Sequence, residues 1–310
     1  MGTSAPGFIL IGVRSLGDFS KTLVAQFVPV ENAAIALERA LEFTHGLPQE
    51  APHSRAADAA LPPGWPAGAA LVFTNLSLRY APELPPSLVA MSLAVRAGER
   101  VGIVGRSGAG KSTVLAALLR LVEGERGCIR LAGIDVTMVG LGTLRRRAAV
   151  VGQEPAFCDG SLRLNLDADG TRTDDELWEL LAACRLDAVV RVLPELLGTA
   201  AGATGLSRGQ LQLLCVVRAL AKRAPLLLLD EATSALDDAT ERAMQAALDA
   251  AAAAGAPPTT LAIAHRLRTI VEYEKVLVME AGRAIEYGAP RALARLEGCF
   301  AELAALQALS

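Results

Sequence analysis

Short apolar runs alternate with helical stretches along most of the chain. Four runs are brief and strongly apolar, at residues 101–104, 148–151, 226–229 and 261–264. Segments with helical spacing of apolar residues separate them, at residues 114–122, 174–184, 210–221 and 240–254. Short buried strands between helices are typical of a mostly parallel sheet. The pattern therefore predicts an α/β fold.

The two ends of the chain differ from this alternation. Residues 1–45 read as helical, whereas residues 46–69 are rich in proline and glycine and predict a linker without a helix. Near the C-terminus, residues 276–280 and 284–286 flank a short turn and predict a hairpin. We expect a final helix over residues 296–310.

Composition narrows the class of protein. Hydrophobic residues make up 52% of the 310 residues, but no apolar run reaches the about 18 residues of a clear membrane span. The first residues lack the basic cluster of a signal peptide. A net charge of −3 and a pI of about 5.8 argue against nucleic acid as a partner. The five scattered cysteines form no metal or disulfide pattern.

A phosphate-binding loop follows the first of the four strands. Residues 105–112 fit the pattern G-x-x-x-x-G-K-[ST], and a helix starts directly after them. Glycines let the backbone amides point at phosphate oxygens, and the helix N-terminus adds positive potential there. We expect Lys111 to reach the β and γ phosphates and Ser112 to hold Mg²⁺.

Polar residues also follow two later strands. Asp230 and Glu231 come after residues 226–229, and His265 comes after residues 261–264. Because parallel strands end at one edge of the sheet, we expect these side chains to meet the phosphate loop. Asp230 would orient the Mg²⁺ shell, Glu231 would polarise an attacking water, and His265 would contact the γ-phosphate.

A further motif, LSRGQ, opens the helix over residues 210–221. Ser207 and Gly209 at a helix N-terminus suit phosphate binding, although a serine there is also an ordinary helix cap. From the residues alone, the ordinary helix cap is the favoured interpretation.

Taken together, the motifs resemble the nucleotide-binding domain of an ABC transporter over residues 70–290. The resemblance rests on their order: the phosphate loop, Gln153, LSRGQ, LLLLDE, the segment from Ser234 to Asp237, and His265. Further stretches are similar to subfamily C, the multidrug-resistance-associated group, at residues 73–80, 101–112, 159–167, 212–215 and 264–267. Its second nucleotide-binding domain is the closer match, because that domain carries a glutamate where Glu231 stands.

The resemblance implies an architecture and partners. It implies a P-loop NTPase fold, an α/β protein with a RecA-like parallel sheet core, an antiparallel β subdomain and an inserted α-helical subdomain, over residues 70–295. Residues 1–45 would hold the end of a last transmembrane helix and a connecting helix. The partners would be transmembrane domains and a second nucleotide-binding domain in a head-to-tail dimer, at the cytosolic face of a membrane.

The resemblance also carries roles to single residues. Catalysis would involve Glu231, His265, Lys111 and Gln153, and Mg²⁺ would be bound by Ser112, Gln153 and Asp230. Contacts with ATP are implied for Tyr80, Gly105, Ser107, Gly108, Ala109, Gly110, Lys111, Ser112, Thr113, Ser207, Gly209, Gln210 and Asp237. Among these, Tyr80 would stack on adenine, Ser207 and Gly209 would clasp the γ-phosphate bound to the partner domain, and Asp237 would cross the dimer seam.

Two departures from the family pattern concern the signature motif. Arg208 stands where a small residue is common, and residues 200–202 lack a glutamate that often precedes the motif. Both affect the composite site that this signature would form with a partner.

The sequence thus predicts a Mg²⁺-dependent ATPase that drives export of an organic solute. A nucleotide-sensing or channel-gating module of the same family is an alternative, as is a soluble ABC-type ATPase of translation or repair, against which the acidic pI and the lack of a second cassette speak. A GTPase is excluded because no Asn-Lys-x-Asp follows any strand.

Overall fold

The chain forms two compact units, residues 1–51 and 52–310. The computed structural model describes residues 5–45, 47, 49–66, 68–233, 236–253, 255, 257–264 and 266–308. The first unit consists mainly of one 41-residue helix, α1 (Ala5–His45), along which Phe8, Phe19 and Phe27 are exposed. Within the described ranges, no helix combines the length and apolar character needed to cross a bilayer.

An antiparallel sheet of four strands begins the second unit. Its order is β2-β1-β4-β5, with bounds β1 (Leu71–Leu78), β2 (Leu88–Val95), β4 (Arg126–Leu131) and β5 (Ile134–Asp135). In β2, buried Leu88, Met91, Leu93 and Val95 give one face of the sheet to the core. This sheet is the antiparallel β subdomain that the motifs implied.

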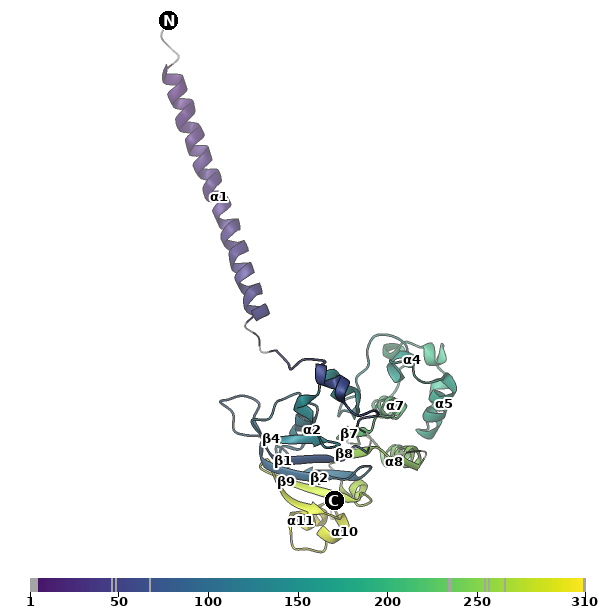
Figure 1. The fold of residues 1–310 in the computed structure, drawn as a ribbon. Coiled ribbons are helices and arrows are strands. Elements are labelled where there is room, and N and C mark those ends of the chain that lie inside the picture. The colour runs from purple at the N-terminus through teal and green to yellow at the C-terminus, as the bar shows by residue number, and fades with distance from the viewer. Residues whose placement is uncertain are drawn as a thin grey trace. The chain divides into compact units, whose positions relative to one another are not determined.

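A six-stranded sheet forms the centre of the second unit (Figure 1). Its order is β10-β9-β3-β8-β7-β6, with bounds β3 (Arg100–Gly105), β6 (Ala148–Val151), β7 (Leu226–Asp230), β8 (Thr259–Ile263), β9 (Lys275–Glu280) and β10 (Arg283–Gly288). The five strands from β9 to β6 run parallel, and β10 pairs antiparallel with β9 as the predicted hairpin. The predicted parallel α/β core is confirmed.

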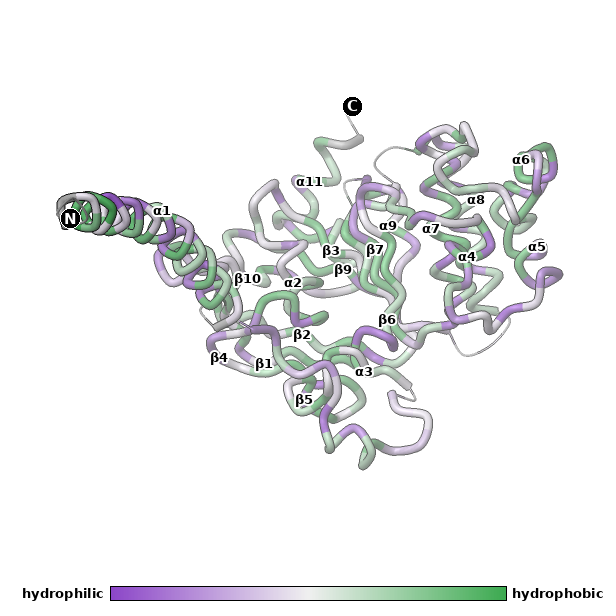
Figure 2. The backbone as a smooth tube through the Cα atoms, turned by 90° about the horizontal axis from the view of Figure 1, so that it is seen from above, coloured by the Kyte–Doolittle hydropathy of each residue, from purple (hydrophilic) through white to green (hydrophobic). Residues whose placement is uncertain are grey.

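Helices cover both faces of this sheet, and helices that follow β6 and precede β7 in the chain form a separate group at one side of it (Figure 2). The α-helices are α2 (Lys111–Leu118), α3 (Leu141–Arg146), α4 (Leu162–Leu166), α5 (Asp174–Ala183), α6 (Asp187–Arg191), α7 (Arg208–Ala221), α8 (Asp238–Ala253), α9 (Leu267–Ile270), α10 (Pro290–Leu293) and α11 (Cys299–Ala308). Short 3₁₀ turns are η1 (Ala56–Ala60), η2 (Val136–Met138), η3 (Leu196–Gly198) and η4 (Ala201–Ala203). The group of α4, α5 and α6 is the inserted helical subdomain.

Two apolar cores lie on the two faces of the central sheet. One joins the antiparallel sheet and α2 to one face of β3, β7 and β8 through Phe73, Val114 and Leu228. The other packs α5, α7 and α8 against the opposite face through Leu229 and Val216. In Figure 2 the central strands are the most uniformly hydrophobic part of the molecule. Burial of both faces explains the continuous apolar runs in the sequence.

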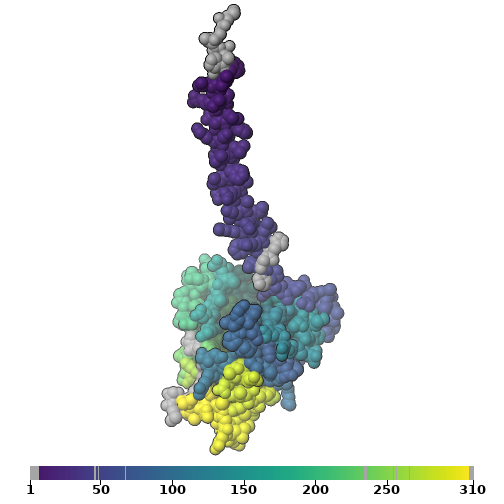
Figure 3. Space-filling view, turned by 90° about the vertical axis from the view of Figure 1, so that its left-hand side faces the viewer, coloured from purple at the N-terminus to yellow at the C-terminus, as the bar shows by residue number. Residues whose placement is uncertain are grey.

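The two sheets also meet at the hairpin. The amide of Val89 on β2 donates to the carbonyl of Gly282 in the β9–β10 turn at 2.9 Å. Accordingly, the C-terminal elements lie beside the blue residues of β2 in Figure 3. The turn thereby fixes the antiparallel sheet next to the phosphate loop, because the amide of Gly282 donates to the carbonyl of Ala109 at 3.1 Å.

The helix after the phosphate loop is shorter than its apolar pattern predicts. It ends at Leu118 rather than at residue 122, and Arg120 has a left-handed backbone with φ of 52°. The guanidinium of Arg120 is buried and donates to the carbonyls of Val136 and Val139 at 3.2 and 3.0 Å. These tertiary bonds end the helix, and apolar spacing alone cannot show them.

The linker is also more ordered than its composition predicts. It contains η1, although proline and glycine led us to expect no helix there. Trp65 is 3% exposed, and its indole nitrogen donates to the carbonyl of Leu131 at 3.2 Å. From residue 52 onward the linker therefore belongs to the second unit.

Candidate functional site

The loop between β3 and α2 has a backbone that two glycines make possible. Gly105 and Gly110 have φ of 151° and 91°. A Cβ on Gly105 would lie 2.2 Å from the carbonyl oxygen of Met279, and one on Gly110 would lie 2.6 Å from that of Ser87. Glycine is therefore needed for both conformation and close approach.

The tip of this loop is open to solvent. Ser107 and Gly108 are exposed, and the amide of Ala109 closes a turn on the carbonyl of Arg106 at 3.1 Å. The turn leads directly into the N-terminus of α2, where backbone amides and the helix dipole favour an anion. The loop thus has the form of a phosphate cradle.

Lys111 lies under the cradle with its ammonium group directed back to the loop. It is 7% exposed, and its Nζ donates to the carbonyls of Gly105 and Arg106, both at 3.0 Å. An ammonium has three donors, of which these carbonyls take two. A buried cation beside the loop provides the charge that a triphosphate requires.

Asp230 ends β7 beside the first turn of α2. Ser112 Oγ donates to Asp230 Oδ1 at 3.2 Å, which joins two positions 118 residues apart in sequence. Burial raises the pKa of the Asp230 carboxyl; Glu231 also raises it, while Ser112 and Lys111 lower it. A hydroxyl and one carboxylate are the oxygen ligands that Mg²⁺ takes together with substrate phosphates. The pair therefore fits Mg²⁺, and no larger cluster of His, Cys, Asp and Glu occurs among the described residues.

Glu231 follows with an unusual backbone. Its φ is 51°, in the left-handed region that side chains other than glycine rarely occupy, and its amide donates to the carbonyl of Ile263 at the end of β8. The half-buried residue is thus fixed between the ends of β7 and β8. Backbone strain of this kind occurs at functional sites.

Tyr80 contacts the first turn of α2. Its hydroxyl is 3.2 Å from Thr113 Oγ1, while the residue as a whole is 53% exposed. Thr113 is buried in the first turn of the helix. An accessible aromatic ring beside the phosphate cradle fits the expected stacking on adenine.

Gln153 is exposed after β6, where a buried neighbour fixes the backbone before it. Gln212 on α7 is 1% exposed, and its Nε2 donates to the carbonyl of Gly152 at 2.7 Å. Sequence reasoning assigned no role to Gln212. A polar residue on the apolar face of a predicted helix was the available signal.

Two of the signature residues, Ser207 and Gln210, bond to each other. Ser207 and Gln210 form a reciprocal capping box, in which Ser207 Oγ accepts from the Gln210 amide at 3.3 Å and the Ser207 amide donates to Gln210 Oε1 at 2.9 Å. Gly209 faces Leu236, which would lie 3.6 Å from an added Cβ. Arg208 pairs with Glu154 at 3.7 Å, with both side chains exposed. In the described parts of the chain, no hydrogen bond joins the signature to the phosphate loop.

Asp237 directly precedes α8 and bonds to its first turn. Its carbonyl accepts from the Glu241 amide at 2.9 Å, and the Thr240 hydroxyl is the main cause that lowers the pKa of its carboxyl. The residue is exposed, as a contact across a seam requires. His265 and Ser234 lie outside the described residues.

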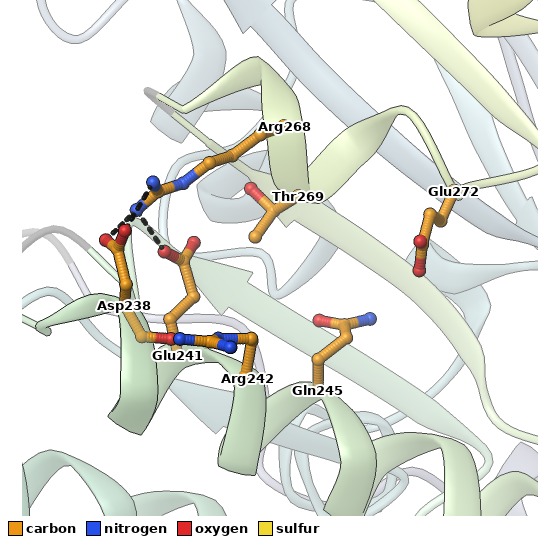
Figure 4. A pocket seen from close by; sticks show the side chains of 7 residues that line it. All are labelled: Asp238, Glu241, Arg242, Gln245, Arg268, Thr269 and Glu272. Carbon is orange, nitrogen blue, oxygen red and sulfur yellow. Dashed lines mark hydrogen bonds and ion pairs between the residues drawn. The ribbon is translucent and has the colours of Figure 1, made fainter.

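Charged residues that follow Asp237 and His265 in the chain form an ion-pair cluster. A cavity of about 230 Å³ lies between α8 and α9, and its lining is Asp238, Glu241, Arg242, Gln245, Arg268, Thr269 and Glu272 (Figure 4). Arg268 bonds to Asp238 and, at 3.0 Å, to the buried Glu241, which also accepts from Arg266 at 2.9 Å. The cavity contains no phosphate-loop residue. Its ion pairs fix the residues that adjoin Asp237 and His265.

Comparisons with known proteins agree with this geometry. The ABC transporter family model matches residues 88–234. ABC transporter C family member 9 of Arabidopsis thaliana is 36% identical over 96% of this chain and 20% of that protein, and ATP-binding cassette sub-family C member 2 of Homo sapiens is 37% identical over 95% and 19%. The chain thus spans about a fifth of the length of these relatives.

A solved structure has the same fold. The structure of a bacterial Atm1-family ABC exporter with ATP bound matches with a TM-score of 0.77 and 33% identity, over 88% of this chain and 46% of that one. It confirms the P-loop NTPase fold that the motifs implied. From the matched family model, the C-family relatives and this fold, we conclude that the chain belongs to the ABC transporter family.

Proposed function

We propose that residues 70–295 bind ATP with Mg²⁺ and hydrolyse the ATP to power export of an organic solute by an ABC transporter. The observation that supports this most is the joining of Lys111, Ser112 and Asp230 at one edge of the parallel sheet, with Glu231 next in the chain. Catalysis of phosphoryl transfer needs mainly position and charge, and these residues supply both.

Each residue at this edge of the parallel sheet has a separate role. Lys111 moves its donors from the loop carbonyls to the β and γ phosphates. Ser112, Asp230 and Gln153 supply oxygens to Mg²⁺, which when bound neutralises phosphate charge. Glu231, with His265, orients a water whose oxygen bonds to the γ-phosphorus while the bond to the β-phosphate oxygen breaks, which yields ADP and phosphate.

The signature would act on a second copy of the site. Ser207 and Gly209 are exposed and half-exposed, and within the described residues no hydrogen bond joins them to the loop of their own chain, which supports a contact with the γ-phosphate of a partner domain in a head-to-tail dimer. Asp237 would cross the same seam. Relatives about five times longer support transmembrane domains as further partners, with α1 and the linker as the connection to them at the cytosolic face of a membrane.

Glu231→Gln tests the proposed function. We expect ATP turnover to fall on the order of 10²-fold or more, while ATP affinity stays within about threefold, because only water activation is removed. Glu272→Gln, two residues after α9 and outside the site, is the matched control and keeps full turnover. Undiminished turnover by Glu231→Gln would refute its role. Binding without turnover by the unmodified chain would favour the nucleotide-sensing alternative.

A further inference from the structure

The linker is bonded to the N-terminus of α3 by one carboxylate. Asp58 Oδ1 accepts from the Gly140 amide at 2.8 Å, and Asp58 Oδ2 accepts from Thr143 Oγ1 at 2.9 Å. Asp58 also accepts from the Arg55 amide at 3.0 Å, within the linker itself. One side chain therefore orders its own segment and caps the helix.

Backbone contacts extend this docking. The Gly142 amide donates to the carbonyl of His53 at 2.8 Å, and the Leu141 amide donates to that of Pro52 at 3.1 Å. A Cβ on Gly142 would lie 2.1 Å from His53 Nε2. The surface of α3 is therefore shaped to receive the linker, and a side chain at residue 142 would displace it.

The other end of α3 is bonded to the helix of the phosphate loop. Arg145 Nε donates to the carbonyl of Leu119 at 3.1 Å, and its Nη2 donates to that of Arg120 at 3.0 Å. Both carbonyls follow the last turn of α2, where a cation is favoured by the helix dipole. Since Lys111 begins α2, the linker and the phosphate loop lie at opposite ends of one bonded path.

The helix that begins at the signature, α7, is also bonded to the C-terminal end of α3. Lys222, directly after α7, donates from Nζ to the carbonyl of Ala148 at 2.7 Å and to that of Arg145 at 3.3 Å. Ser207 caps the other end of α7. Ala148 begins β6, whose far end leads to Gln153. Bonds from the ends of α2, α7 and β6 thus meet where α3 joins β6. The other ends of these three elements lead to Lys111, Ser207 and Gln153.

We propose that this α3–β6 junction, formed by Arg145, Ala148 and Lys222, couples the docked linker to the ATP site. The proposal rests on the proposed function, in which the linker leads to the membrane part. Helices α2 and α7 are about 12 and 21 Å long, so a shift at the junction reaches their phosphate-facing ends as rigid displacement. Arg145, Lys222 and Asp58 are positioning residues that touch no phosphate.

Coupling between sites is reciprocal, which gives a direct test in the full 310-residue chain. In the unmodified chain, we expect ATP with Mg²⁺ to slow amide hydrogen exchange at Gly140 and Gly142 roughly fivefold or more. In Arg145→Met and Lys222→Met the linker contacts remain, but this response should be lost while ATP still binds. Arg145→Lys, which keeps a cation, should restore part of it.

Controls separate the possible outcomes. Arg163→Met removes a guanidinium that donates to the Arg172 carbonyl at 2.7 Å in the helical subdomain, and it should keep the response. ATP binding without any change at Gly140 and Gly142, or an unchanged response in both junction variants, overturns the inference alone. Absence of ATP binding by the unmodified chain overturns the proposed function and this inference with it. If either methionine variant unfolds, Asp58→Asn tests the path from the linker end, with an altered ATP affinity as the expected result.

Discussion

The two phosphate-related regions of this chain differ in how their polar groups are satisfied. At the phosphate loop, Ser112 bonds to Asp230 from a distant part of the sequence, and the buried Lys111 bonds to the carbonyls of the loop itself. At the signature, the side chains of Ser207 and Gln210 bond only to each other's backbone amides among the described residues, and Ser207 is exposed. The first region is assembled by the fold of one chain, whereas the second is left at the surface.

This difference indicates what each region needs to become active. Burial and a converging sheet edge already concentrate charge at the phosphate loop, which is the condition for strong electrostatic catalysis. The signature has a satisfied helix cap with an exposed hydroxyl, which supports the proposal that it binds the γ-phosphate of a second domain. Substitutions at the loop should therefore change ATP binding and turnover by the isolated chain. Substitutions at the signature should change ATP-dependent dimer formation.

The largest effect is expected for Lys111→Met. Removal of a buried cation under the cradle should lower ATP turnover on the order of 10²-fold or more and weaken nucleotide binding. Lys21→Met on α1, where the ammonium is exposed, is the control and should change neither quantity. Equilibrium binding of a fluorescent ATP analogue and phosphate release measure the two effects. Binding that is unchanged in Lys111→Met would mean that the loop is not the triphosphate site.

A second substitution should separate activity from stability. Asp230→Asn should abolish most Mg²⁺-dependent turnover but raise the melting temperature of the ion-free chain by a few degrees. Burial raises the pKa of the Asp230 carboxyl above 3.8, so its stability cost is absent below pH 3.8 and develops as pH rises through the folded pKa. Calorimetry at pH 7 and pH 4 checks this, since the gain should shrink at the lower pH. A lower melting temperature at pH 7 would contradict it.

The signature gives a smaller effect that can be divided into two parts. Ser207→Ala removes the helix cap and the hydroxyl together, and it should cost about 1 kcal/mol of stability. Ser207→Asn keeps a good cap but replaces the hydroxyl, so its stability should stay close to that of the unmodified chain. Both variants should bind ATP as monomers with little change but reduce ATP-dependent dimer formation, as light scattering would measure. Equal dimer formation by both variants and the unmodified chain would remove Ser207 from the proposed seam.

The sequence predicted the phosphate-loop region better than the regions around it, for a physical reason. Lys111, Asp230 and Glu231 each follow a buried apolar strand, and parallel strands bring such positions to one edge. The docking of Asp58 on α3 and the bonds of Arg120 that end α2 are tertiary contacts of polar side chains, which the spacing of apolar residues does not show. Proline and glycine predicted a linker without a helix, whereas it contains the 3₁₀ turn η1, and they carry no information about the surface on which the linker docks.

The smallest effect on the isolated chain is expected for Arg208→Gly, which restores the small residue common at this position. Its ion pair with Glu154 is long at 3.7 Å and exposed on both sides, so the melting temperature should change by less than about 2 °C. If this pair fixes the signature against the segment after Gln153, ATP-dependent dimer formation should change in Arg208→Gly and respond less to salt, because an exposed pair is screened. Glu154→Gln should reproduce both changes, since it removes the same pair from the other side. Different responses of the two variants would show that Arg208 acts outside its pair, at the seam itself.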